Sequence, residues 1–154
     1  MERLTLRQTT EPMGCCYMNE RLDLTPLKNA VNRLAEGLTR YAKDVTDTQI
    51  RDGLIQRFEF TYEISHKMLK RYLEAVSATP AQFDAMAFAD LIRSANEQSL
   101  LLGDWSAWRA SREMRSKTSH TYDEDVAIEV VQAIPAFLDE ARYLLAQLHQ
   151  RNTL

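Results

Sequence analysis

Apolar residues recur at spacings of three and four over most of the chain, and this period constrains the fold more than any other sequence feature. It appears first between Leu27 and Tyr41 and again between Leu54 and Val76. Residues three and four apart lie on one face of a helix, so each run describes an amphipathic helix. The 154 residues include only 4 Gly and 4 Pro, which leaves few positions for the turns of an all-β protein. The sequence therefore predicts an all-α fold.

Breaks in this period and residues that commonly cap helices divide the chain into four long helices and one short one. No run alternates with the period of two that a strand requires, and no segment repeats. The expected helix starts are Asp23 or Thr25, Asp47-Thr48, Thr79-Pro80, Asp104 and a T-x-x-E capping box at Thr121-Tyr122-Asp123-Glu124. The short helix is the one that Asp104 caps. Brief loops between such helices predict an up-and-down four-helix bundle with one short extra helix.

The N-terminal segment lacks the helical period. Residues 1–17 contain Pro12, Gly14 and the pair Cys15-Cys16, whereas an orderly pattern begins at Met18-Asn19-Glu20. We expect residues 1–17 to be a disordered extension, with Met18 as an alternative start, and residues 18–150 to form the helical bundle. A domain of this length can bury one continuous core.

Charge and cysteine content bound the classes of partner. The formal net charge of -3 provides no overall attraction to nucleic acid, so any phosphate contact must come from a local patch. Two adjacent cysteines form neither a disulfide framework nor a zinc site, which indicates a reducing compartment. No apolar stretch reaches the length of a bilayer span, and the N-terminus does not resemble a signal peptide. We expect a cytoplasmic protein without a membrane contact.

Glu63 and His66 have the Glu-x-x-His spacing that di-iron helical bundles use. Such a site needs a second copy of the motif and two more glutamates, and neither His120 nor His149 completes one. The chain also lacks a Gly-rich phosphate loop. We therefore expect no metal and no other cofactor, and we interpret His66 as a boundary histidine of the second long helix.

A row of basic residues leads along the short helix to a histidine. Arg109, Arg112 and Arg115 step by three, Lys117 extends the row, and His120 follows in the connector before the last helix. The free N–H groups at the start of that helix favour an anion, although three acidic residues there oppose one. By its spacing alone, such a row is more often a solvated face without a ligand, and a phosphate-binding segment is the alternative.

Tyr122 falls two residues after His120, at the predicted first position of the last helix, where a side chain tends to face outward. Its phenol would then be available as a donor, an acceptor or a nucleophile. The structural alternative is a partly exposed aromatic ring that packs over the start of the helix.

Arg115, four intervening residues, His120, one residue and Tyr122 resemble the R-x4-6-H signature of the HEPN superfamily. The form R-x4-H-x-Y is that of its toxins paired with minimal nucleotidyltransferases. Three segments in order, residues 18–22 (MNERL), 57–63 (RFEFTYE) and 117–124 (KTSHTYDE), are similar to signatures of the nucleotidyltransferase substrate-binding proteins, a HEPN branch. The resemblance covers about residues 18 to 150. Two positions depart from it: Ser116 stands where many HEPN nucleases carry a strongly polar group such as Asn, and His66 where an aromatic is common.

The resemblance implies a metal-independent endoribonuclease whose cleft forms where two copies of the motif meet in a homodimer. Cleavage of RNA by its own 2′-hydroxyl needs a base, an acid and positive charge on the phosphate. The resemblance assigns Arg115 and His120 to these catalytic roles. It also implies that a cognate minimal nucleotidyltransferase adds AMP to Tyr122 and thereby silences the toxin. The expected substrate-binding residues around the motif are Arg112, Ser116, Lys117 and Ser119.

Three functions remain open at this point. The leading one is the ribonuclease toxin of a two-gene toxin–antitoxin module. The second is a non-catalytic subunit that presents a substrate or nucleotide to a separate nucleotidyltransferase. The third is a helical scaffold in which the segment from Arg115 to Tyr122 only caps a helix. We interpret Glu59 and Glu63 as surface charges in preference to groups that orient the motif, and Trp105 and Trp108 as core or dimer anchors.

Overall fold

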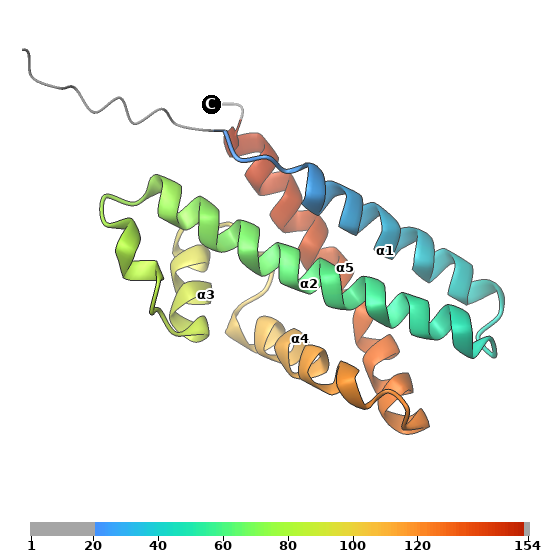
Figure 1. The fold of residues 1–154 in the computed structure, drawn as a ribbon. Coiled ribbons are helices and arrows are strands. Elements are labelled where there is room, and N and C mark those ends of the chain that lie inside the picture. Colours follow the sequence, from blue (N-terminus) through green and yellow to red (C-terminus); the bar gives the residue numbers. More distant parts are fainter. Residues whose placement is uncertain (1–20, 153–154) are drawn as a thin grey trace, which may run out of the picture.

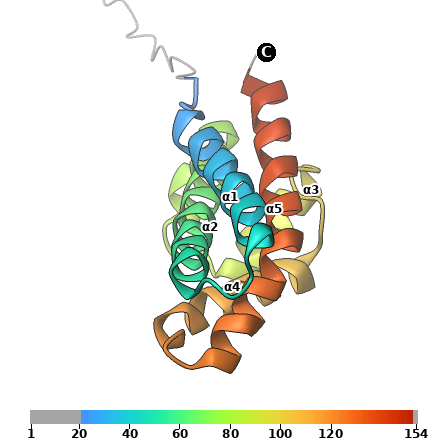
Figure 2. The same ribbon diagram turned by 90° about the vertical axis from the view of Figure 1, so that its right-hand side faces the viewer.

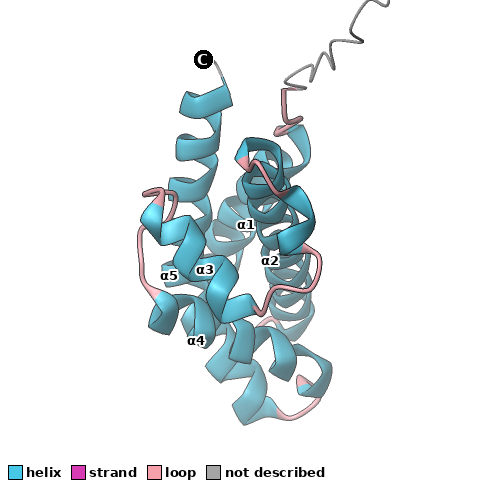
Figure 3. Ribbon diagram, turned by 90° about the vertical axis from the view of Figure 1, so that its left-hand side faces the viewer, coloured by secondary structure: helices cyan, strands magenta, loops and turns pink. Residues whose placement is uncertain are grey.

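The computed structural model describes residues 21–152, and these residues form helices, turns and loops without a strand (Figure 3). The three long helices are α1 (Thr25–Lys43), α2 (Thr48–Val76) and α5 (Glu124–Asn152), and the two shorter ones are α3 (Phe88–Glu97) and α4 (Trp105–Lys117) (Figure 1). Single 3-10 turns span Pro80–Phe83 and Thr118–His120. The prediction of an all-α fold is confirmed, whereas the extension expected over residues 1–17 lies outside the described residues.

The segment after α2 differs from its prediction as one long helix. A 3-10 turn at Pro80–Phe83 is followed by non-helical residues, and α3 begins only at Phe88. Met86 and Phe88 are two residues apart and both pack against the core. One continuous helix would not place both on the same face, because only residues three and four apart share a face. The chain therefore has three long and two shorter helices in its described part.

Helix α2 lies at the centre of the arrangement, in contact with all four other helices. Helices α1 and α5 run beside it, α4 packs against both α2 and α5, and α3 packs against α2 and α4 (Figure 2). Phe58, Trp108 and Phe137 join three of these helices in the core: the ring of Phe137 meets Phe58 edge-on at 5.1 Å and Trp108 at 6.1 Å between ring centroids. Buried aromatic pairs of this geometry stabilise a core beyond their area. Trp108 is thus a core residue, as predicted.

Two aspartates cap helices: Asp104, as predicted, and Asp47, which was predicted only as part of the break before the second helix. The carboxylate of Asp47 accepts from the amides of Gln49 (3.0 Å) and Ile50 (3.1 Å) at the start of α2. Asp104 accepts from the amide of Ser106 (2.9 Å) at the start of α4. Such caps satisfy amides that have no partner within the helix. They define where α2 and α4 begin.

The N-terminal end of α1 and the C-terminal end of α5 lie together (Figure 1). The side-chain amide of Asn152 forms two hydrogen bonds with the backbone of Leu22, one at 3.0 Å from the Leu22 amide and one at 2.9 Å to its carbonyl. Within residues 21–152, no helix is long and apolar enough to cross a membrane.

Candidate functional site

The segment between α4 and α5 is held by short-range hydrogen bonds. The hydroxyl of Thr118 donates to the carbonyl of Arg115 (2.7 Å), and the hydroxyl of Thr121 donates to the carbonyl of Thr118 (3.2 Å). The amide of Asp123 donates to the carbonyl of His120 (3.1 Å). Because each bond spans three residues, the connector, residues 118–123, follows a tight path that presents His120 to solvent.

The predicted capping box is wrong by two residues. Helix α5 begins at Glu124, and the carboxylate of Asp123 accepts from the amides of Asp125 (3.0 Å) and Val126 (3.4 Å). Thr121 is not the cap, because the amide of Asp123 donates to the carbonyl of His120 and the first free amides of α5 bond to Asp123. Tyr122 therefore lies in the turn before α5, with 87% of its surface exposed, and not at the first helical position.

The carboxylate of Glu124 bonds to α2 instead of completing a capping box. It accepts from Nη1 of Arg51 at 2.6 Å. The Arg51 side chain is only 9% exposed, and this hydrogen bond raises the pKa of its guanidinium further. A buried cation without such a partner would be costly. The pair therefore ties the start of α5 to the start of α2.

The guanidinium of Arg115 is held by α2 and by the connector. Its Nε donates to Oε1 of Glu63 at 3.2 Å, its Nη2 bonds to the same oxygen, and its Nη1 donates to the hydroxyl of Thr118 at 3.0 Å. Glu59 adds an ion pair at 3.7 Å. The interpretation of Glu59 and Glu63 as plain surface charges is therefore wrong, since both orient Arg115. The three hydrogen bonds use three of its five N–H groups.

His120 and Tyr122 form an exposed pair beside this arginine's helix. The Tyr122 hydroxyl lies 3.5 Å from Nδ1 of His120, and the two rings meet at 77° with centroids 6.0 Å apart. Both side chains are exposed. A reagent or substrate can therefore reach the imidazole and the phenol from solvent.

The predicted substrate-binding residues separate into two environments. Lys117 pairs with Glu129 of α5 at 2.7 Å and with Glu113 at 3.6 Å, and the hydrogen bond that its ammonium donates to Glu129 is the main reason why its pKa is raised. Arg112 instead lies over the ring of Phe88, with its guanidinium carbon 4.8 Å from the ring centre. A cation over an aromatic face is attracted by the ring quadrupole.

The two serines of the set bond to the backbone that precedes them. Ser116 donates to the carbonyl of Arg112 (3.2 Å), and Ser119 donates to the carbonyl of Ser116 (3.3 Å). Arg112 and Ser116 also line an open hollow of about 340 Å³, together with Trp105, Arg109 and Glu113. The hollow therefore brings part of the basic row to one surface.

His66 packs among aromatic rings. It meets Phe88 edge-on at 5.0 Å and lies 6.5 Å from the ring of Tyr62. Burial lowers its pKa, and the nearby charges of Arg112 and Lys70 lower it further. The imidazole of His66 makes the ring contacts that an aromatic side chain would make at this position, which explains why a histidine is accommodated there. Within residues 21–152, no group of three His, Cys, Asp or Glu side chains could hold a metal ion.

Two contributors to this site were missed at the sequence level. Thr118 lies three residues after Arg115, the spacing at which a side chain on the same turn can bond back, but such threonines are common. Arg51 lies on the buried side of α2, three and seven residues before Leu54 and Phe58. A cation on an apolar face signals a buried partner. The sequence does not say that this partner is Glu124.

Comparison with known proteins agrees with these features. The family model described as nucleotidyltransferase substrate binding protein like matches residues 22–150. A Haemophilus influenzae protein named probable ribonuclease HepT is 38% identical over 143 residues, which cover 88% of this chain and 97% of the relative. The solved structure of HI0074 from Haemophilus influenzae, described as revealing the fold of a substrate binding domain of a nucleotidyltransferase, superposes with a TM-score of 0.78. It is 36% identical and covers 82% of this chain and 99% of its own.

The match extends from before α1 to near the end of α5, so it includes the α4–α5 connector and the α2 residues that hold Arg115. The resemblance inferred from the R-x4-H-x-Y motif and its flanking segments is thereby confirmed. The chain belongs to the nucleotidyltransferase substrate-binding protein family, a branch of the HEPN superfamily.

Proposed function

We propose that this protein is the toxin of a two-gene toxin–antitoxin module, a cytoplasmic, homodimeric, metal-independent endoribonuclease that a minimal nucleotidyltransferase neutralises by AMPylation of Tyr122. The observation that carries the proposal is the oriented Arg115, which keeps two N–H groups free of the hydrogen bonds to Glu63 and Thr118 and lies on the helix that leads to the exposed His120. The relative named probable ribonuclease HepT supports the activity.

The reaction that suits these groups is transesterification within RNA. The 2′-oxygen attacks the adjacent phosphorus, the bond to the 5′-oxygen breaks, and the products carry a 2′,3′-cyclic phosphate and a 5′-hydroxyl. One His120 accepts the 2′-hydroxyl proton, and His120 of a second copy donates a proton to the departing oxygen. The free N–H groups of Arg115 stabilise the negative charge that builds on the phosphate oxygens.

Dimerisation is needed in this proposal because one connector supplies one imidazole. Two copies that bring their connectors together would place a base and an acid on opposite sides of one phosphodiester. The substrate-binding residues Arg112, Ser116, Lys117 and Ser119 would then flank the RNA backbone. Lys117 must exchange Glu129 for a phosphate to take part, since its ammonium is already paired.

The position of Tyr122 supports its proposed modification. Transfer of AMP from ATP to the exposed phenol oxygen forms a phosphodiester and releases pyrophosphate. The new phosphate would lie close to His120, because Nδ1 of His120 is 3.5 Å from the phenol oxygen before modification. It would occupy the space of the substrate phosphate and repel it. Silencing therefore requires no unfolding of the bundle.

The test is RNA cleavage by purified protein in the presence of EDTA. The parent should cleave, and His120→Ala should lose the activity. His66→Phe is the matched control, because it removes a histidine yet keeps a ring against Phe88. A His120→Ala protein that cleaves at the parental rate would contradict the proposal. Mass spectrometry after incubation with the adjacent-gene nucleotidyltransferase and ATP tests AMP on Tyr122, with Tyr122→Phe as control.

A second candidate is a non-catalytic subunit that presents a substrate or nucleotide to a separate nucleotidyltransferase. It is favoured by the description of the HI0074 structure as a substrate binding domain of a nucleotidyltransferase. Protein that binds nucleotide, forms a complex with the nucleotidyltransferase and leaves RNA intact would favour this candidate. Both candidates share a nucleotidyltransferase partner.

We also propose that α1, α2, α4 and α5 form the up-and-down four-helix bundle of the domain. Three pairs of contacts support this alternation of directions. Leu22 before α1 meets Asn152 at the end of α5, Arg51 near the start of α2 meets Glu124 at the start of α5, and Arg115 near the end of α4 meets α2. The family match over residues 22–150 supports a domain over residues 18–150 with residues 1–17 as an extension outside it.

A further inference from the structure

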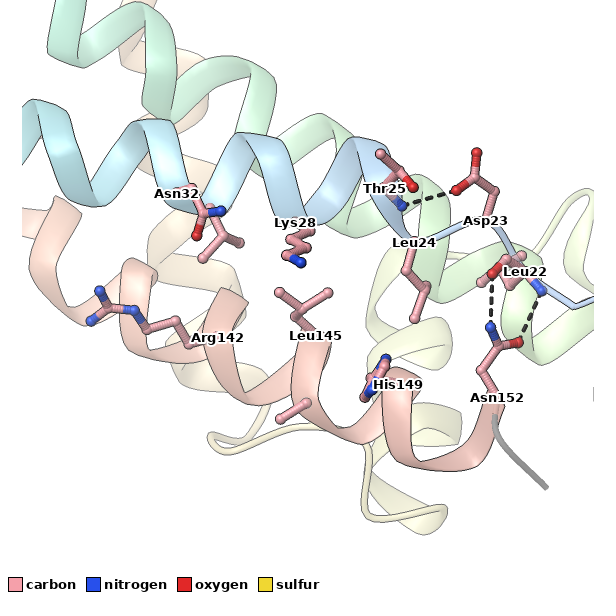
Figure 4. A pocket seen from close by; sticks show the side chains of 12 residues that line it. Leu22, Asp23, Leu24, Thr25, Lys28, Asn32, Arg142, Leu145, His149 and Asn152 are labelled. Carbon is pink, nitrogen blue, oxygen red and sulfur yellow. Dashed lines mark hydrogen bonds between the residues drawn. The ribbon is translucent and has the colours of Figure 1, made fainter.

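A groove of about 630 Å³ lies between the first turns of α1 and the last turns of α5, at the opposite end of α5 from the connector (Figure 4). Small-molecule sites commonly have volumes of about 300–1,000 Å³. Asn152 and Leu22, joined by their two hydrogen bonds, stand at one end of the groove, and Arg142 and Asn32 stand at the other. The groove is thus separate from the candidate ribonuclease site.

The apolar part of the groove wall is aliphatic. Leu24 and Val31 from the α1 side face Leu145 and Ala146 of α5, and no Phe, Tyr or Trp lines it. Leu145 points from α5 toward α1 (Figure 4). A surface of this kind favours an alkyl chain, because burial of each methylene is favourable by about 0.8 kcal/mol. It offers no ring on which a nucleobase would stack.

Three basic side chains line the same groove. Lys28 projects from α1 toward α5, His149 projects from α5 toward α1, and Arg142 lies about two turns before His149 (Figure 4). None of the three has a hydrogen bond or ion pair with another residue of the described part of the chain. Asp23 is the single carboxylate among the lining residues, and it accepts from the amide of Thr25 at 3.0 Å.

The charge of the groove is therefore opposite to that of the chain. Lys28 and Arg142 outnumber Asp23 by one positive charge, whereas the whole chain has a formal net charge of -3. Elsewhere in the described residues, Arg51, Arg115 and Lys117 each have a carboxylate partner. Unpaired cations next to an aliphatic surface are complementary to a ligand that has both an anionic and an apolar part.

We infer that this groove binds an amphipathic organic anion, with its carboxylate or phosphate monoester head between Lys28 and Arg142 and its alkyl chain against Leu24, Val31 and Leu145. His149 and Asn32 can donate to the same head group. The site is independent of the proposed ribonuclease activity, since it shares no residue with the α4–α5 connector.

The test is a calorimetric titration of the full 154-residue chain with four probes. Octanoate and octyl phosphate carry the head and the chain, octanol carries only the chain, and inorganic phosphate carries only the head. At least one of the two octyl anions should bind in a saturable manner, about tenfold more tightly than octanol or inorganic phosphate, and added salt should weaken it. The stronger of the two anions identifies the head group. Absence of saturable binding by both, or equal binding of octanol, overturns the inference.

Two exposed arginines provide a matched pair of variants. Arg142→Gln should weaken binding of the octyl anion about tenfold, the usual cost of one lost contact to a charged group. Arg71→Gln removes a comparable charge from α2, outside the groove, and should leave binding unchanged. Equal losses in both variants would show a general charge effect and contradict the site. The His120→Ala protein should bind the anion as the parent does, so failure of the ribonuclease proposal leaves this test intact.

Discussion

The two ends of α5 use positive charge in different ways. At the connector end, Arg51, Arg115 and Lys117 each pair with two carboxylates. At the groove end, Lys28 and Arg142 have no such partner among the described residues. Paired guanidiniums are held in one orientation, which suits a site that must act on a phosphate at a defined place. Unpaired cations remain available to a ligand that supplies its own negative charge.

The largest expected effect concerns the paired arginine. Arg115→Ala should lower the rate of RNA cleavage about 10²–10³-fold, the range for removal of one group that stabilises charge in the transition state. Arg115→Lys should restore little, because an ammonium cannot reproduce the bonds to Glu63 and Thr118 at once. The measurement is the single-turnover cleavage rate.

Arg71→Ala, which removes an exposed arginine from α2, serves as the control and should cleave at the parental rate. Thermal melts of all three variants show whether the bundle remains folded. If Arg115→Ala retains full activity while His120→Ala loses it, the arginine has a structural role only, and the contrast between the two ends of α5 loses its functional meaning.

The second largest effect is expected on the stability of the fold when Glu124 is lost. Glu124→Ala leaves the buried guanidinium of Arg51 without its 2.6 Å partner and should reduce the free energy of unfolding by about 1–3 kcal/mol, the cost of a lost bond to a charged group. Urea unfolding measures it. Glu36→Ala, at an exposed position of α1, should change stability much less. Equal effects would mean that the Arg51–Glu124 pair does not hold the connector end.

Glu140 lies between the two ends of α5, and the raised pKa of its carboxyl predicts that the stability of the fold depends on pH. Burial raises the pKa of its carboxyl, and Asp104 raises it further, although the amides of Leu102 and Gly103 and the indole of Trp108 oppose this. A folded-state pKa above the unfolded one means that the native state holds its proton more tightly. Stability should therefore rise as the pH falls from neutral through this raised pKa toward 4.5, the ordinary pKa of a glutamate carboxyl, and above that pH window the ionised group is unfavourable.

Glu140→Gln should flatten this part of the pH profile, because an amide does not titrate. Thermal melts at several pH values between neutral and about 4.5 measure the pH profile of the melting temperature, with Glu36→Gln as the matched control. Parallel profiles for the parent and Glu140→Gln would show that other groups cause the dependence.

The smallest effect is expected at the groove end. Arg142→Gln removes a cation with no partner among the described residues, so the free energy of unfolding should change by less than about 0.5 kcal/mol. The same urea titrations provide the value. A loss as large as that of Glu124→Ala would reveal a partner for Arg142 and would remove the difference between the two ends.

The extent to which the fold could be predicted depends on how local each signal is. The apolar period from Leu27 and from Leu54 placed α1 and α2, and its break at Asp47-Thr48 separated them. Asp104 marked the start of α4 because a cap acts within three residues. The break before Phe88 was missed because the local sequence is compatible with both a helix and a turn. Only the packing of both Met86 and Phe88 against the core distinguishes the two. Thr121 was mistaken for a cap because Asp123, two residues later, is an equally good capping residue and the 3-10 turn that delays the start of α5 leaves no mark in the sequence.

By itself, the sequence determined the helical class, the motif of Arg115, His120 and Tyr122 and the family, because these depend on residue order along one or two turns of helix. Only the tertiary structure decided that Glu63 holds Arg115, that Glu124 neutralises Arg51 and that Lys28 and Arg142 line the same groove. The residues of these three pairs are separated by 52, 73 and more than a hundred positions in the chain. Charge and hydrophobic contacts act over a few ångströms in space, and the packing of the helices alone brings such residues within that range.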